Sequence, residues 1–175
     1  KASGTVGEPL LFQSIAAVRA GCFKSYVIDK NGEEQVLGFY LPGEIIGFDA
    51  IHEKIHKANV VALDTSSVCG LSFESVTEMA RQLPALQDEL FRVMSLHIAE
   101  LEASAADLSA EERIASLLCS LSKRFASRGY SAKEFNLSMS RRDIASNLRL
   151  ATETISRVLA RFQSAGIIRV NRKKV

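Results

Sequence analysis

The sequence has no apolar run close to the roughly 20 residues that a membrane-spanning helix needs. No signal-peptide pattern opens the chain, which starts at Lys1, and we expect further sequence beyond both ends. Only three cysteines occur, Cys22, Cys69 and Cys119, and their spacing does not resemble a disulfide framework. These features argue against a membrane protein or a disulfide-built secreted domain and favour the reducing cytoplasm.

An excess of charge of one sign is also missing, because 22 Lys and Arg nearly balance 20 Asp and Glu and leave a net charge of +2. The charges are unevenly distributed, however. Residues 1–108 carry 8 basic against 15 acidic residues, a balance of −7, and residues 109–175 carry 14 against 5, a balance of +9. An acidic front and a basic back indicate two modules, the second suited to a polyanion, with a solvated basic face as the alternative.

Short β-rich runs separated by turns fill residues 15–73. Asn31-Gly32 favours a hairpin, since both turn residues must accept a positive φ, and Pro42-Gly43 suits a type II turn. The expected strands lie in SIAAVRAG, FKSYVI, NVVAL and SSVCGLSF. Several short strands at this spacing predict a small barrel or jelly roll over residues 1–83.

Glycine and proline are absent from residues 85–108, which follow the helix-start residue Pro84. Apolar residues recur there at alternating spacings of three and four, which predicts a helix over 84–108 with the seam of a coiled-coil dimer. The seam comprises Phe91, Met94, Ile98, Leu101, Ala105 and Leu108. It spans fewer than three heptads, so packing against the chain's own barrel is the alternative.

The basic part, 109–175, contains two capping boxes, Ser109 with Glu112 and Ser140 with Asp143, and each predicts the start of a helix. The first helix carries an apolar stripe and ends near Gly129, and EFNLSM follows as a short strand. After Ser140 come a short helix, a turn at residues 149–151 and a second helix that Gly166 closes. IIRV begins a further strand. Together with the front module this predicts an α+β protein.

Two short helices joined by a tight turn in a basic module are typical of a helix-turn-helix, whose second helix enters the major groove of DNA. Glu153, Ser156 and Arg157 share one face of that helix, while Ile155, Leu159 and Phe162 should pack inward. Arginine can bond guanine twice, glutamate can accept from cytosine, and serine adapts to either. We add as candidate DNA contacts Thr152, Ser140 and, in a wing after IIRV, Arg172. An ordinary helical hairpin with a Glu153–Arg157 surface pair is the alternative.

These stretches make the chain resemble the family of the cyclic-AMP receptor protein and the fumarate-and-nitrate-reduction regulator, most closely the second branch. The resemblance rests on EEQVLGFYLPGEIIGFDA, SSVCGLSFE, ERIASLLCSLSKRFASRG and EFNLSMSRRDIASNLRLATETISRVLARFQ. It implies a jelly-roll sensor, a long dimer helix and a winged helix-turn-helix that binds palindromic promoter DNA. It also implies RNA polymerase as a partner and no enzymatic activity.

In the anaerobic branch, the positions that match Glu153, Ser156 and Arg157 read a TTGAT-type half-site. The position that matches Cys69 joins three N-terminal cysteines around an oxygen-sensitive [4Fe-4S] cluster. Those three cysteines are absent from this chain, so the resemblance implies a cluster only in a longer parent protein. From the residues alone, each cysteine would serve as a small hydrophobic side chain.

Three residues depart from the family pattern. Arg149 stands where relatives have a turn glycine, and Ala151 stands where they have a capping threonine, although Thr152 could cap one residue later. Leu101 lies on the seam near a point where oxygen-switched relatives often carry an acid. We therefore expect a slightly remodelled turn and a differently tuned switch.

Two other functions compete with this prediction. Gly43-Glu44 matches part of the cyclic-nucleotide phosphate cassette, but Lys57-Ala58 stands where Arg-Ser is expected, and lysine lacks the bidentate fork of arginine. His52, Glu53 and His56 spell the HExxH signature of zinc proteases. That signature needs a helix, and we expect a loop here; Asn59 and Ala62 also replace the glycine and third histidine of the extended pattern.

Overall fold

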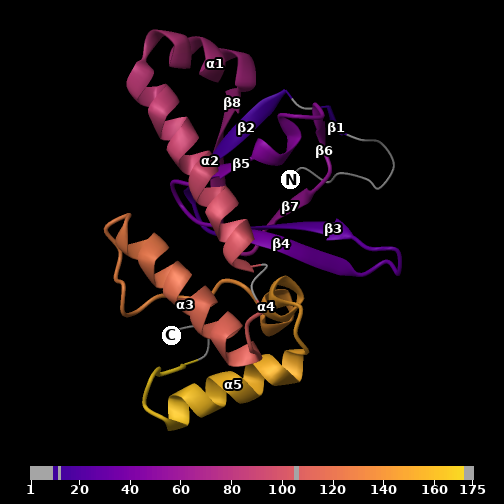
Figure 1. Cartoon of the computed structure of the whole chain (residues 1–175), viewed down its shortest axis with the longest axis vertical. Coiled ribbons are helices and arrows are strands. Elements are labelled where there is room, and N and C mark those ends of the chain that lie inside the picture. The colour runs from indigo at the N-terminus through magenta and orange to yellow at the C-terminus, as the bar shows by residue number, and fades with distance from the viewer. Residues whose placement is uncertain (1–9, 12, 105–106, 172–175) are drawn as a thin grey trace.

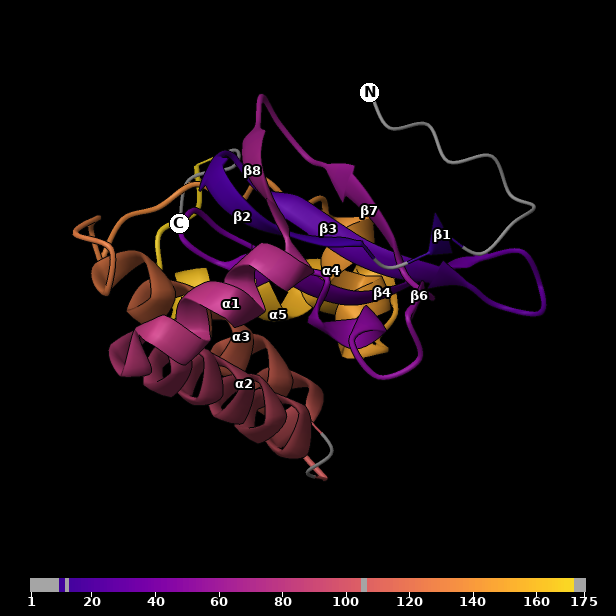
Figure 2. The same cartoon turned by 90° about the horizontal axis from the view of Figure 1, so that it is seen from above.

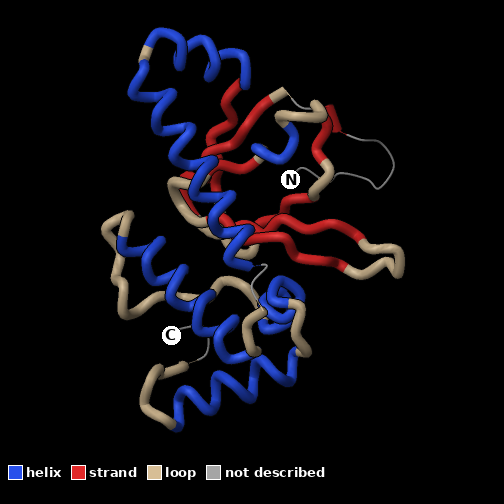
Figure 3. Tube along the Cα trace, viewed as in Figure 1, coloured by secondary structure: helices blue, strands red, loops and turns tan. Residues whose placement is uncertain are grey.

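The structure is a computed structural model that describes residues 10–171 apart from 12, 105 and 106. Strands fill its first part, α1 lies at one end, α2 runs from that end along the strands, and three further helices form the other end (Figure 1, Figure 3). The predicted α+β architecture is confirmed. Among the described residues, no helix is long and apolar enough to cross a bilayer.

The strands pair antiparallel in three small sheets, in the orders β1-β6, β5-β2-β8 and β4-β3-β7. Their bounds are β1 Leu10–Leu11, β2 Ser14–Ala20, β3 Phe23–Ile28, β4 Glu34–Tyr40, β5 Ile45–Ile46, β6 Ile55–His56, β7 Asn59–Ala62 and β8 Ser67–Ser72, with a 3₁₀ turn at Phe48–Ala50. The hairpin predicted at Asn31-Gly32 joins β3 to β4, but only Gly32 has the positive φ expected of both residues. Asp29 Oδ1 accepts the backbone N–H groups of Asn31 and Glu33 inside that turn. Gly43 adopts φ 84° in the predicted turn before β5.

Helix α1, Phe73–Gln82, was not predicted. Ser72 ends β8 and also caps α1, because its side chain accepts the backbone N–H of Ser75, so no loop separates strand from helix. Helix α2, Pro84–Ser104, starts as predicted and packs beside α1 (Figure 2). Buried Ile15, Ala50 and Val76 join the strands to α1 in a small core.

The C-terminal part contains α3 Ala110–Ala126, α4 Arg141–Leu148 and α5 Thr152–Ser164. Both predicted capping boxes are formed in full, at Ser109 with Glu112 and at Ser140 with Asp143. The strand predicted at EFNLSM is wrong, since only Asn136 makes a bridge there. Leu137 and Met139 are nevertheless buried, so the alternating pattern reflects core contact without strand pairing. In IIRV, likewise, no residue is part of a strand.

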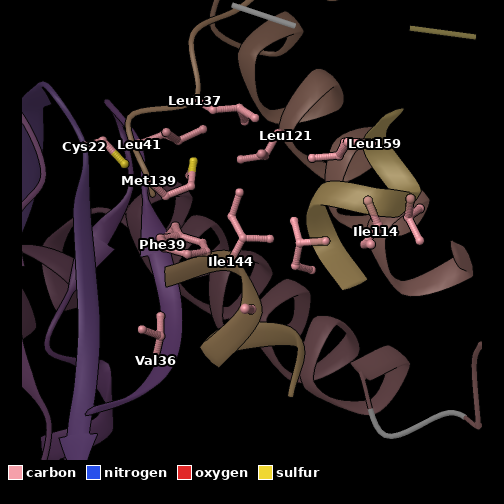
Figure 4. Packing of buried hydrophobic residues seen from close by; sticks show 13 residues of the cluster. Cys22, Val36, Phe39, Leu41, Ile114, Leu121, Leu137, Met139, Ile144 and Leu159 are labelled. Atoms are coloured by element: carbon pink, nitrogen blue, oxygen red, sulfur yellow. The ribbon is translucent and has the colours of Figure 1, made fainter. Parts of the chain in front are cut away.

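One hydrophobic core crosses from the strands into the C-terminal helices. Its buried members are Cys22, Val36, Phe39, Leu41, Ile114, Leu121, Leu137, Met139, Ile144, Ala145, Ile155, Val158 and Leu159. Figure 4 shows side chains of β4 and of α3, α4 and α5 meeting in this cluster. The basic module is therefore packed onto the strands as well as following them in sequence.

Candidate nucleic-acid interface

Helices α4 and α5 are joined by the short turn of residues 149–151. Arg149 adopts the left-handed conformation (φ 54°, ψ 48°), and its backbone N–H and that of Leu150 bond carbonyls of the last turn of α4. This αL ending closes a helix in the manner that usually selects glycine. The turn therefore has the left-handed geometry that glycine favours, with an arginine at that position.

Ala151 is the N-cap of α5, and its side chain makes no capping bond. The prediction that Thr152 could cap one residue later is wrong, because Thr152 is already the first helical residue. Thr152 is half-buried, and its carbonyl accepts a hydrogen bond from Ser156 Oγ at 3.2 Å. The helix therefore begins without the side-chain cap that Ser140 provides for α4.

Helix α5 separates its two faces as predicted. Ile155 and Leu159 are buried, whereas Glu153, Ser156 and Arg157 are exposed. Within the described part of the chain, no ion pair joins Glu153 to Arg157, which removes the support for the surface-pair alternative. Glu153 and Arg157 are thus not paired with each other, and both lie on a face that can contact base edges.

Of two further candidate DNA contacts, Ser140 and Arg172, the structure describes only Ser140. Ser140 is exposed, and its hydroxyl serves the capping box: it accepts from Asp143 N at 3.1 Å and donates to Asp143 Oδ2 at 2.6 Å. Arg172 lies outside the described residues. Burial lowers the pKa of Arg141, the first residue of α4.

The predicted seam on α2 is largely exposed. Phe91 is 60% exposed and Ile98 is 55% exposed, and Met94 on the same face is exposed as well. The side chain of Leu101 is not described, and Ala105 lies outside the described residues. The described helix ends at Ser104, earlier than predicted, and Leu108 is half-buried in the segment before α3.

The expected role as a small core residue is confirmed for Cys22 and not for the other two cysteines. Cys22 is buried, and burial raises the pKa of its thiol to about 12. Cys69, on β8 opposite Ala17, and Cys119, on α3, are both exposed, so for them the core interpretation is wrong. No group of three or more metal-ligating side chains occurs in the described ranges. Cys69 would supply one open thiolate, and a [4Fe-4S] cluster needs four ligands.

The HExxH match is not helical. His52 and Glu53 lie in a turn, while His56 belongs to strand β6. Histidines four apart converge on one metal only when a helix places them on the same face. Glu53 instead pairs with Lys57, which lies four residues later. The protease alternative is rejected on this geometry.

The residues of the cyclic-nucleotide alternative are engaged elsewhere. The Glu44 carboxylate accepts Leu41 N at 2.9 Å and binds Arg124, whose Nε and Nη2 lie 2.8 and 2.5 Å from its two oxygens. Arg128 adds a third cationic contact at 3.2 Å. Lys57 is exposed beside Glu53. Glu44 therefore joins the strands to α3, and this arrangement gives the alternative no support.

No pattern in the sequence indicated that Lys24 is buried against the C-terminal part. This lysine of β3 is 8% exposed, and its Nζ lies 2.5 Å from Glu34 Oε2 and 2.7 Å from Asp143 Oδ1. Burial alone would lower its pKa, but hydrogen bonds to Asp143 and Glu34 hold the pKa above its usual value. Its partner Asp143 lies 119 residues away in the sequence, so no local pattern indicates the contact.

Comparisons with known proteins agree with this geometry. Residues 112–175 match the Crp-like helix-turn-helix domain, and residues 7–82 match the cyclic nucleotide-binding domain. The chain is 44% identical to Electron transport regulator A of Shewanella oneidensis, over 97% of this chain and 68% of that protein. It is 42% identical to the Fumarate and nitrate reduction regulatory protein of Salmonella typhimurium, over 93% of this chain and 66% of that protein.

Among solved structures, FixK2 from Bradyrhizobium japonicum superposes with a TM-score of 0.82 at 26% identity, covering 96% of this chain and 84% of that chain. The chain spans about two thirds of the length of the regulators from Shewanella oneidensis and Salmonella typhimurium.

Proposed function

The chain belongs to the family of Crp-like transcription regulators, in the branch of the fumarate and nitrate reduction regulatory protein, and we propose that it binds palindromic, TTGAT-type promoter sites as a dimer. The family consists of DNA-binding regulators and not of enzymes. The observation that carries the proposal is the exposed face of α5, where Arg157 and Glu153 are unpaired with each other on the second helix of a helix-turn-helix.

The chemistry of that face fits such a half-site. Arg157 would donate to O6 and N7 of guanine, and Glu153 would accept from N4 of a cytosine. Ser156 lies between them and has a hydroxyl that already donates to Thr152 O, which leaves its lone pairs to accept a further bond. Because Ile155 and Leu159 anchor the opposite face in the core, the reading face is held in a fixed orientation.

The exposed seam of α2 supports the proposal of a dimer. Phe91, Met94 and Ile98 form an open apolar row, and such a row on a soluble protein usually marks an interaction surface. A second copy would cover it with the same row, as the two-fold symmetry of a palindrome requires. Leu101, Ala105 and Leu108 would extend the seam. RNA polymerase is the further partner that we propose, with a cytoplasmic location.

Control by oxygen is the finer part of the proposal, and it is supported by the similarity to the Fumarate and nitrate reduction regulatory protein, whose branch the sequence resembles. Cys69 is exposed in the middle of β8 and would provide one ligand of a cluster whose other three thiolates come from a longer parent chain. A [4Fe-4S] cluster would supply an oxygen-labile group there. Anaerobic reconstitution of a full-length protein should load iron in wild type and fail in Cys69→Ser; equal iron in both would leave Cys69 without this role.

DNA binding is tested by replacing Arg157 and a matched control on the same helix. Arg157→Ala should weaken the palindrome by about 1–3 kcal/mol and relax preference at one base pair in each half-site. Arg161→Ala removes the same charge one turn later, where Arg161 pairs with Glu111, and should leave base preference unchanged. Fluorescence anisotropy with palindromic and scrambled duplexes measures the affinity and the sequence preference of each variant. Equal affinity of the wild type for both duplexes would refute the proposed function.

A further inference from the structure

We propose that Lys24 and the outer edge of β4 form a docking site for α4, and that Lys24 thereby positions the DNA-reading helix and sets the half-site spacing that the dimer accepts. The inference rests on the proposed function, because spacing has meaning only for a dimer on a palindrome. It concerns Lys24, a strand residue far in sequence from the helix-turn-helix.

The first contact holds the start of α4. Lys24 is buried, and it bonds Asp143 in the first turn of that helix and Glu34 beside it on β4. Asp143 also closes the capping box with Ser140, so one carboxylate both starts the helix and ties it to the strands. Hydrogen bonds from Lys24 and Ser140 hold the pKa of Asp143 below its ordinary value despite burial, which would raise it. A buried charge that loses its partner is strongly disfavoured, so this contact opposes separation.

The second contact holds the end of the same helix. Ser146 Oγ accepts the backbone N–H of Val36 at 2.9 Å and donates to Glu34 O at 2.8 Å. Gln35 Nε2 donates to Ser146 O at 2.7 Å, and Asn147 Nδ2 donates to Val36 O at 3.4 Å. Strand β4 lies at the edge of its sheet, and these bonds satisfy backbone groups that an open edge would leave to water. The register of α4 on the strand is therefore fixed at both ends.

Apolar contact fills the space between the two polar contacts. Val36 and Phe39 of β4 belong to the same buried cluster as Ile144 and Ala145 of α4 (Figure 4). Helix α4 in turn packs on α5, whose buried Ile155 lies in that cluster. Fixing α4 on the strands thus fixes the orientation of the reading helix relative to the sensor and to α2.

This rigidity has a measurable consequence on DNA. One inserted base pair moves a half-site by about 3.4 Å and turns it by about 35° around the axis, since a helical turn is about 34–36 Å and 10–10.5 base pairs. Two rigidly held reading helices cannot follow that change. Reading helices can follow it when α4 is no longer held on β4. Preorganisation of this kind also lowers the ordering cost of binding. Lys24 should therefore affect spacing preference more than contact with a single half-site.

The test uses the whole chain and three duplexes: the preferred palindrome, the same palindrome with one base pair inserted between half-sites, and a single half-site. Wild type should favour the first over the second by about tenfold or more, and Lys24→Met should reduce that ratio to about threefold or less, with half-site affinity within about twofold. Glu33→Gln is the matched control, because it breaks an ion pair between the same hairpin and α4, Glu33–Arg142, whose side chains are 68% and 81% exposed. That variant should behave as wild type.

Lys24→Met leaves two carboxylates without their cation and can lose stability, so Gln35→Ala provides a second variant. Gln35→Ala removes the hydrogen bond to Ser146 O at the other end of α4 and leaves no buried charge. It should reduce the preference for the original palindrome over the one with an inserted base pair by about twofold. A folded Lys24→Met protein with the wild-type ratio, or an unchanged ratio in Gln35→Ala where Lys24→Met does not fold, overturns the inference. Failure of the wild type to prefer any palindrome would instead refute the proposed function.

Discussion

The strained turn between α4 and α5 allows a sharp prediction about stability. Arg149 occupies the left-handed region, which costs a residue with a side chain about 1–2 kcal/mol, while glycine enters it freely. Glycine also loses more freedom on folding, which offsets about 0.5–1 kcal/mol. We therefore expect Arg149→Gly to raise the free energy of unfolding by about 0.5–1 kcal/mol and Arg149→Ala to give no gain.

Thermal unfolding measures the difference between these two variants. In a chain of 175 residues, 1 kcal/mol corresponds to about 2–4 °C in Tm, so Arg149→Gly should melt about 1–4 °C above Arg149→Ala. Both variants lose the same guanidinium, which leaves the backbone as the difference between them. Protein concentration must be equal, because assembly shifts Tm by mass action. An Arg149→Gly protein that melts at or below Arg149→Ala would refute the left-handed turn.

Three further predictions concern the seam, the thiols and acid. Ile98→Glu should shift the protein towards monomer in sedimentation and weaken palindrome binding with it; a monomer that kept wild-type affinity would refute the coupling. In native protein near pH 8, a thiol reagent should modify Cys69 and Cys119 rapidly and Cys22 only after unfolding, because burial raises the pKa of Cys22 to about 12. Since the pKa of Asp143 is lowered by folding, its stabilisation is present above its ordinary pKa and is lost as the pH falls through the lower folded value. The free energy of unfolding, measured with urea, should therefore fall less steeply from about pH 5 to pH 3 in Asp143→Asn than in wild type. Equal pH dependence in the two proteins would contradict the role of Asp143.

Local chemistry in the sequence predicted much of the C-terminal part. Ser140 and Asp143 determine where α4 begins, and the apolar spacing from Ile155 to Leu159 determines which face of α5 is buried. Arg149 was recognised as a departure and does take the left-handed turn. These features depend on neighbours within four residues, which is the range over which a sequence pattern is informative.

Features that depend on distant partners were missed or misjudged. Helix α1 escaped prediction because Ser72 belongs to a strand and to a helix cap at once, with no intervening turn residues. Cys119 comes directly after the apolar stripe of α3 in the sequence. Because each residue turns the helix by about 100°, its side chain lies on the exposed side. Lys24 reads as an ordinary strand residue until the fold brings Asp143 against it.

The helix-turn-helix is connected to the rest of the molecule on two sides, and this arrangement limits how a signal on α2 can reach it. Arg113 Nε donates to Leu108 O at 2.9 Å, and its Nη1 donates to Leu148 O at 3.3 Å, so one guanidinium joins the segment after α2 to the end of α4. The other side of α4 is held by Lys24 and β4. A displacement of Leu108 must therefore either break a bond of Arg113 or pull α4 against its contacts with the strands. A signal changes the orientation of α5 only if its free energy differs between the two arrangements by more than those contacts contribute.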